Sequence, residues 1–240
     1  MRIDETTLQV LFERSDHYLK LMLFFGIAGW IGFLFLKKED KTNPTMVYSL
    51  GILLHIAFYE FLASILAAQQ INNHWVYNIF NGHIGSILFL LLIRSLLKKK
   101  IHRRIVLYFI AALLLISGAL HFNGIASLHD GGEYIALVNT VFILSSCSLY
   151  FFELITMDEN LAINPLKSFS FWITTTILFY ISSSFMIYIS YVYLYTNHIE
   201  LYYMVSEIPR HMSLLCNFLL CFGIYSQVIK QRFELEIIHV

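Results

Sequence analysis

The sequence carries little charge for its length, and neither sign dominates. Only 13% of its 240 residues are Asp, Glu, Lys or Arg, and 16 basic residues balance 16 acidic ones. Soluble domains usually carry about 25% charged residues, so this composition argues against a soluble domain. The chain also lacks a basic domain that could neutralise phosphates, which argues against nucleic acid as a partner.

Cysteine and proline are scarce as well. The three cysteines, Cys147, Cys216 and Cys221, all lie in apolar segments. An odd number of such residues, without a CxxC spacing, indicates neither a disulfide framework nor a redox site. We therefore interpret them as small apolar packing residues. No cleavable signal peptide is expected, because residues 1–17 are polar and mixed in charge.

Apolar residues are what the chain has in abundance. They make up 58% of it, and the mean hydropathy is +0.67. Seven apolar segments are long enough to cross the roughly 30 Å hydrocarbon layer as helices. The predicted spans are 19–36, 46–68, 76–97, 105–121, 134–155, 169–196 and 206–228. The predicted fold is an all-α polytopic seven-helix bundle between a polar tail, 1–18, and a second tail, 229–240.

Basic residues lie almost entirely on one side of this bundle. The loops after spans one, three and five and the C-terminal tail contain Lys37, Lys38, Lys41, Lys98, Lys99, Lys100, Arg103, Arg104, Lys167, Lys230 and Arg232. The loops after spans two, four and six, together with the start of span seven, contain only Arg210. By the positive-inside rule, this asymmetry predicts an outside N-terminus and a cytoplasmic C-terminus. In the seventh span, Ser206 is expected to be the N-cap, with Pro209 in the first turn.

Ionisable side chains inside the spans are the candidates for function. Each costs about 2.5–3.5 kcal/mol at the centre of a membrane helix, so such residues mark functional sites by default. Most lie in the predicted outer half of the bundle, which favours an outward-facing polar pocket. The predicted ligand-binding residues are Glu60, His83, Glu207, Arg210 and His211. A purely structural alternative pairs Arg210 with Glu60 or Glu207 and leaves nothing to bind. Glu153, in span five, is expected to extend to the cytoplasmic surface.

A metal or haem site is a further alternative for the histidines in the spans. Its candidates are His55, His83, His121 and His211, but no HxxxH, HExxH or paired Cys/His spacing supports it. No catalytic residue, metal or other cofactor is therefore predicted.

Small residues indicate where helices approach closely. Span one contains Gly26, Gly29 and Gly32, and span three places Asn78, Asn81, Gly82 and Gly85 on one stripe. Such stripes allow close packing either within the bundle or between two copies of the chain, as in a homodimer.

Several segments taken together resemble a known family. They are Asn-His-Trp-Val-Tyr-Asn-Ile-Phe at 73–80, Ser-Leu-Tyr-Phe-Phe-Glu-Leu at 148–154, Asn164-Pro165 before Phe171-Trp172, and Asn217. In this order they are similar to a family of uncharacterised bacterial seven-helix membrane proteins, some of which resemble the sensory modules of histidine kinases. The resemblance covers roughly residues 45–228. It implies signal reception in the bacterial cytoplasmic membrane without naming a ligand.

These observations favour a non-enzymatic sensor or signalling module. Since only the tail 229–240 follows the seventh span, its signal is expected to pass through a cytoplasmic or membrane partner. The basic run at 98–104 is the candidate docking surface, or else serves topology and attraction to anionic lipid. The alternatives are a membrane-embedded, metal-dependent hydrolase acting on lipid, and a transporter. No proline lies at mid-span and no inverted repeat is evident, so transport is the least favoured.

Overall fold

The computed structural model describes residues 17–125, 133–157 and 164–238, which are almost entirely helical. Seven helices in this part of the chain are long and apolar enough to cross a membrane. They are α2 (His17–Leu34), α4 (Pro44–Ala68), the composite helix α5–η1–α6 (His74–Val76, Tyr77–Gly85 and Ser86–Leu96), α7 (Lys100–Phe122), α8 (Glu133–Thr156), α10 (Phe169–Asn197) and α11 (Ile199–Ile238). Two short helices, α3 (Lys38–Lys41) and η2 (Pro165–Lys167), lie in connections. The prediction of seven apolar helices long enough to span a membrane is confirmed, and the chain is a multi-pass membrane protein. The tail 1–16 lies outside the described residues.

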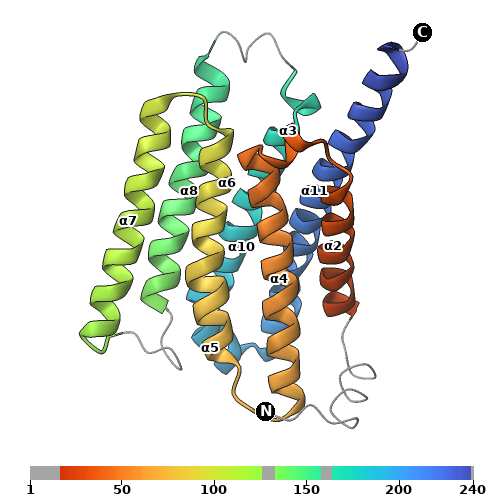
Figure 1. Cartoon of the computed structure of the whole chain (residues 1–240). Helices are drawn as coiled ribbons and strands as arrows, with labels where there is room; N and C mark the ends of the chain where they lie inside the picture. Colours follow the sequence, from red (N-terminus) through yellow and green to blue (C-terminus); the bar gives the residue numbers. More distant parts are fainter. Residues whose placement is uncertain (1–16, 126–132, 158–163, 239–240) are drawn as a thin grey trace.

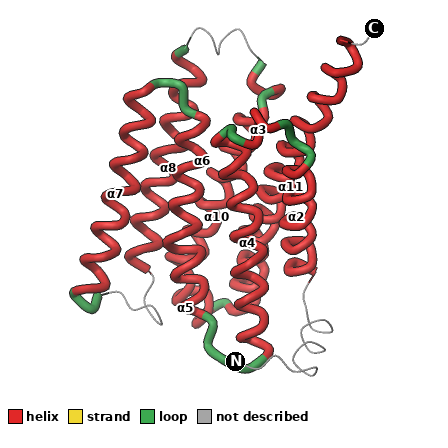
Figure 2. Tube along the Cα trace, in the orientation of Figure 1, coloured by secondary structure: helices red, strands yellow, loops and turns green. Residues whose placement is uncertain are grey.

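The helices form two rows (Figures 1 and 2). α4 and α6 stand in front of α10 and α11, while α2 packs on α4 and α11 at one flank and α7 packs on α6 and α8 at the other. The loop 35–43, the α6–α7 connection, η2 and the end of α11 lie at one end of the bundle, which we call the basic end. The other end, the opposite end, contains the loop 69–73, Phe122 and His198.

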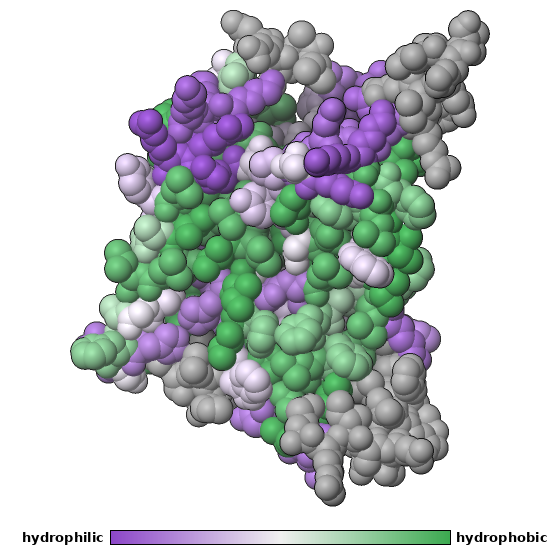
Figure 3. All heavy atoms as spheres, in the orientation of Figure 1, coloured by the Kyte–Doolittle hydropathy of each residue, from purple (hydrophilic) through white to green (hydrophobic). Residues whose placement is uncertain are grey.

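The outer surface of the bundle is apolar between these ends. Figure 3 shows a belt of hydrophobic residues below the hydrophilic side chains of the basic end. Large exposed side chains of this kind include Leu115, which is 74% exposed, and Ile155, which is 69% exposed. Such a broad apolar surface is unfavourable in water and matches the hydrocarbon layer of a membrane.

Two helices, α7 and α11, differ most from the predicted bounds. α7 already begins at Lys100, so the basic residues 100, 103 and 104 belong to its first turns. α11 is a single helix of 40 residues that begins at Ile199. Ser206 is therefore not its N-cap: its hydroxyl donates back to the Tyr203 carbonyl (2.9 Å), and Pro209 lies inside the helix. The break that separates α10 from α11 falls at His198, which has a non-helical backbone (φ −145°, ψ 62°).

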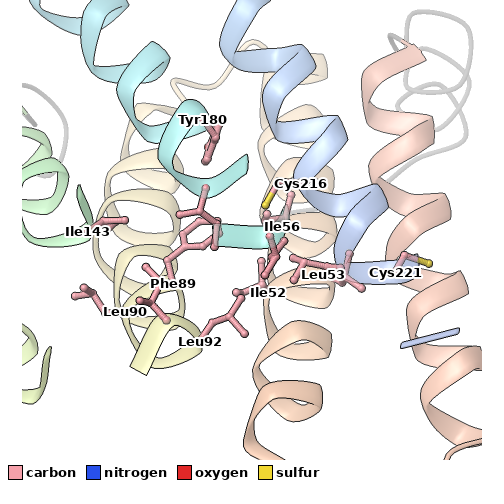
Figure 4. Close-up of a cluster of buried hydrophobic side chains, with 14 of the residues drawn as sticks. Ile52, Leu53, Ile56, Phe89, Leu90, Leu92, Ile143, Tyr180, Cys216 and Cys221 are labelled. Atoms are coloured by element: carbon pink, nitrogen blue, oxygen red, sulfur yellow. The ribbon is translucent and has the colours of Figure 1, made fainter. Parts of the chain in front are cut away.

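A buried apolar layer crosses the middle of the bundle (Figure 4). Ile52 and Leu53 of α4 meet the side chains of α6, α8, α10 and α11 there, and many members of the layer are 0–1% exposed. The labelled members are Ile52, Leu53, Ile56, Phe89, Leu90, Leu92, Ile143, Tyr180, Cys216 and Cys221. All three cysteines are free and buried, which confirms their interpretation as packing residues.

The glycines of α2 permit its close approach to α4 and α11. A Cβ on Gly26 would lie 2.8 Å from the Ala57 Cβ, and one on Gly32 would lie 3.0 Å from the Tyr225 ring. Real Cβ atoms do not come within 3.0 Å of a neighbour, so an alanine at Gly26 would have to push α2 away from α4. This glycine stripe therefore packs within the chain, which is one of the two alternatives given by the sequence.

Candidate functional site

A cavity of about 200 Å³ lies toward the opposite end, between η1, α8 and α10. We call it the polar pocket. Its lining is rich in amide, hydroxyl and imidazole groups, and none of the described lining residues is Asp, Glu, Lys or Arg. The lining residues are Tyr77, Asn78, Asn81, Gly82, His83, Ser86, His121, Ile135, Ala136, Asn139, Thr140, Ile143, Tyr180, Ile181, Ser184, Phe185 and Tyr188.

One wall of the polar pocket is a π-helix. η1 covers nine residues, Tyr77–Gly85, within a span that is otherwise α-helical. Two glycines at its end, Gly82 and Gly85, weaken the preference for a regular α-helix. π-helical segments are rare, and they are frequent at functional sites.

Side chains from other helices hold η1 in this conformation. His55 of α4 places its Nε2 2.8 Å from the Phe80 carbonyl oxygen. Asn139 of α8 donates from its Nδ2 to the Gly82 carbonyl oxygen. Within η1, the His83 Nδ1 lies 2.7 Å from the Asn78 carbonyl oxygen. Three backbone carbonyls of this segment therefore accept side-chain hydrogen bonds.

Asn139 is the polar residue most clearly placed for a ligand. It is only 5% exposed and lines the polar pocket. Its Nδ2 is bonded to Gly82, while its buried Oδ1 finds no hydrogen-bond partner among the described residues. A buried amide oxygen without a partner costs about 1–3 kcal/mol, and a ligand that donates a hydrogen bond would recover that cost.

Two histidines from different helices meet at the rim of the polar pocket. The Nε2 atoms of His83 in η1 and His121 in α7 are 3.4 Å apart, and the two rings are stacked with an interplanar angle of 24°. Both residues are half-buried. The two histidines were separate candidates before the fold was known, and the fold brings them together.

Glu60 lies in a second polar cluster, next to the polar pocket. It is 8% exposed, and its carboxylate accepts hydrogen bonds from the hydroxyls of Tyr77 (3.2 Å) and Tyr18 (3.5 Å). The Tyr18 hydroxyl also lies 3.3 Å from the Ser213 Oγ. Since Tyr77 both bonds Glu60 and lines the polar pocket, it connects the two.

The predicted site residues on α11 do not line the polar pocket. Glu207 and Arg210 form an ion pair of 2.7 Å along one helix face, with side chains 48% and 38% exposed. The Arg210 guanidinium also lies over the Tyr18 ring, 5.0 Å from its centroid, so it borders the Glu60 cluster. His211 is exposed and bonds the Glu207 carbonyl oxygen within α11 (2.7 Å). Of the five predicted residues, only His83 lines the polar pocket, and Glu60 reaches it through Tyr77.

Sequence reasoning missed Asn139 and Thr140, because it considered mainly ionisable groups. Both are buried polar residues inside an apolar span, and polar uncharged residues at membrane depth are also signals of a site or a packing contact. Tyr18, the partner of Glu60, was missed because tyrosine is common near span ends.

The metal candidates are mostly separated. The His55 Nε2 bonds the Phe80 carbonyl oxygen of η1, and the His211 Nδ1 bonds the Glu207 carbonyl oxygen of its own helix. Neither of these bonds connects to His83 or His121. Within residues 17–125, 133–157 and 164–238, no group of three or more His, Cys, Asp or Glu side chains is arranged to hold a metal ion.

At the basic end, Glu153 is buried rather than extended to the surface. It is 2% exposed, and its carboxylate accepts from the backbone N–H groups of Lys98 (2.6 Å) and Lys99 (2.9 Å). The His102 Nδ1 lies 2.7 Å from the same carboxylate. The expectation that Glu153 extends outward is therefore wrong, because these N–H groups at the start of α7 satisfy its charge inside the protein.

The comparisons with known proteins add no relative: no family model, curated protein or solved structure matches this chain. The resemblance to the bacterial seven-helix family thus stays a prediction from the sequence.

Proposed function

We propose that this chain is a membrane receptor that binds a small ligand in the polar pocket and passes the signal to a partner at the basic end. The observation that carries the proposal is Asn139, which lines a cavity of about 200 Å³ and whose buried Oδ1 has no hydrogen-bond partner among the described residues. A cavity lined by a few convergent polar groups among apolar side chains is the usual form of a ligand site.

The proposed orientation places the basic end in the cytoplasm of a bacterium and the polar pocket toward the outside. It is supported by the lysines at 37–41 and 98–100, because the two connections that contain them share one end of the bundle (Figure 1). Basic residues in short loops are retained on the cytoplasmic side.

α11 is the element best suited to carry a signal between the two ends. At about 1.5 Å per residue, its 40 residues extend about 60 Å, well beyond the hydrocarbon layer. At the opposite end, its Arg210 lies over Tyr18 of the Glu60 cluster. At the basic end, Gln227 and Gln231 donate to the Asp40 carboxylate, and α11 projects from the bundle (Figure 1). A movement of α11 would therefore displace Asp40, which lies in the short helix α3 before α4.

Ligand binding can be tested on the purified full chain. Thermal unfolding is measured against a panel of small amides, sugars, amino acids and carboxylates. A pocket ligand is expected to stabilise the protein by about 2.7 kcal/mol at a hundred times its Kd. The Asn139→Ala variant should lose that stabilisation. The matched control is Asn217→Ala, since Asn217 is equally buried in α11 but does not line the polar pocket. A panel in which no compound stabilises the protein, or in which both variants respond as the natural chain does, contradicts the proposal.

A further inference from the structure

We propose that His83 and His121 together bind a divalent transition-metal ion such as Zn²⁺, with open coordination positions facing the polar pocket. This inference rests on the proposed function in one respect, because both require that the polar pocket can be reached from solution. It goes beyond that function by proposing a metal ion in the pocket, and a bound ligand would occupy one of the open coordination positions of this ion.

The distance between the two imidazoles is the first argument. Their Nε2 atoms are 3.4 Å apart, at the long end for a hydrogen bond, since N–H···O bonds measure about 2.7–3.2 Å. Nitrogen ligands bind Zn²⁺ at about 2.0–2.1 Å in tetrahedral geometry, which places two of them about 3.3–3.4 Å from each other. The observed separation is that of two neighbouring ligands of one ion.

The hydrogen bond on the far side of His83 is the second argument. Its Nδ1 lies 2.7 Å from the Asn78 carbonyl oxygen, which can only accept. Nδ1 therefore carries the proton, and Nε2 presents its lone pair toward His121. Histidines that bind metals almost always donate their other N–H to a carbonyl or carboxylate, because this fixes the tautomer and the ring orientation.

The surroundings favour a cation over an anion. His121 is the penultimate residue of α7, whose C-terminal carbonyls carry partial negative charge. No lysine or arginine is among the described residues that line the polar pocket. Imidazole ligands suit Zn²⁺, Cu²⁺ and Ni²⁺ and do not suit Mg²⁺ or Ca²⁺. With two protein ligands, the remaining positions are left for water or a pocket ligand.

The test is metal binding to the purified, chelator-treated full chain. Co²⁺ is titrated and followed by its visible absorption, and Zn²⁺ is then titrated by calorimetry. One ion should bind per chain, and His83→Gln or His121→Gln should each weaken binding at least about tenfold. His211→Gln is the matched control, because the His211 imidazole also bonds a backbone carbonyl oxygen but does not belong to the pair formed by His83 and His121. Thermal unfolding without metal checks that each variant is folded, and the two variants lie on different helices, so one misfolded variant leaves the other informative.

Two results would overturn the metal site. Either no saturable Co²⁺ or Zn²⁺ binding occurs, or binding is unchanged in both His83→Gln and His121→Gln. The histidines would then form a packed pair only. If the Asn139-dependent stabilisation by a small compound persists in that case, only the metal inference fails. If metal binds as expected but no compound stabilises the protein, the proposed receptor role fails and the metal site stands.

Discussion

At the scale of one residue, Glu153 is a buried carboxylate whose contribution to the stability of the fold depends on its hydrogen-bond partners. Its two carboxylate oxygens bind the backbone N–H groups of Lys98 and Lys99 and the His102 imidazole. These bonds connect the start of α7 to α8. Hydrogen bonds to a charged group are stronger than neutral ones, and loss of the carboxylate removes these three together.

Glu153→Ala is therefore expected to lower the free energy of unfolding by about 2–4 kcal/mol. The same substitution at Glu207 provides the control, since that residue is in an exposed ion pair of 2.7 Å with Arg210. Exposed pairs contribute about 0–1 kcal/mol, so Glu207→Ala should change stability little. Thermal or denaturant unfolding in detergent micelles measures both. Equal effects of the two substitutions would show that burial of Glu153 does not stabilise the α6–α7 connection.

At the scale of the element, the packing of α2 depends on having no side chain where it meets α4. The Gly26 Cα is close enough to Ala57 that one added methyl group forces the helices apart. Gly118 of α7 has nothing within 4 Å of where its Cβ would be, so it tests helix propensity alone.

Gly26→Ala is expected to destabilise the protein by about 1–3 kcal/mol through overpacking. Gly118→Ala should instead be neutral or stabilising by about 0.5–1 kcal/mol, because alanine favours the helix. The midpoints of thermal unfolding decide between these opposite signs. A neutral Gly26→Ala would mean that α2 packs loosely or elsewhere.

The elements were much easier to predict from the sequence than the site was. Length and hydropathy determine each span, and all seven spans were found. α11 was predicted too short because its first turns, 199–205, follow a tyrosine-rich stretch without a clear boundary signal. The site depends on how each helix is rotated, and hydropathy does not define this well, because lipid and protein interior are both apolar. That is why His83 and His121 could be named but not paired, and why Asn139 was overlooked.

At the scale of the whole molecule, the distribution of basic residues predicts the orientation of the bundle in the membrane, and this orientation can be tested in cells. Single cysteines are introduced at Lys38, at the basic end, and at Ile71, at the opposite end, both of which are exposed. A membrane-impermeant maleimide should label Ile71→Cys in intact cells and Lys38→Cys only after permeabilisation. The native cysteines are 0–7% exposed and should stay unlabelled. The reverse pattern would place the polar pocket on the cytoplasmic side.

The buried layer of Figure 4 has an electrical consequence. Ile143 and Tyr180 belong both to this layer and to the wall of the polar pocket, and Phe89, Leu90 and Leu92 of the same layer are 0–3% exposed. Among the described residues, tightly packed apolar side chains therefore lie between the polar pocket and the basic end. In a membrane that carries a voltage, we expect most of that voltage to fall across this layer, because its apolar packing separates the polar pocket from the basic end.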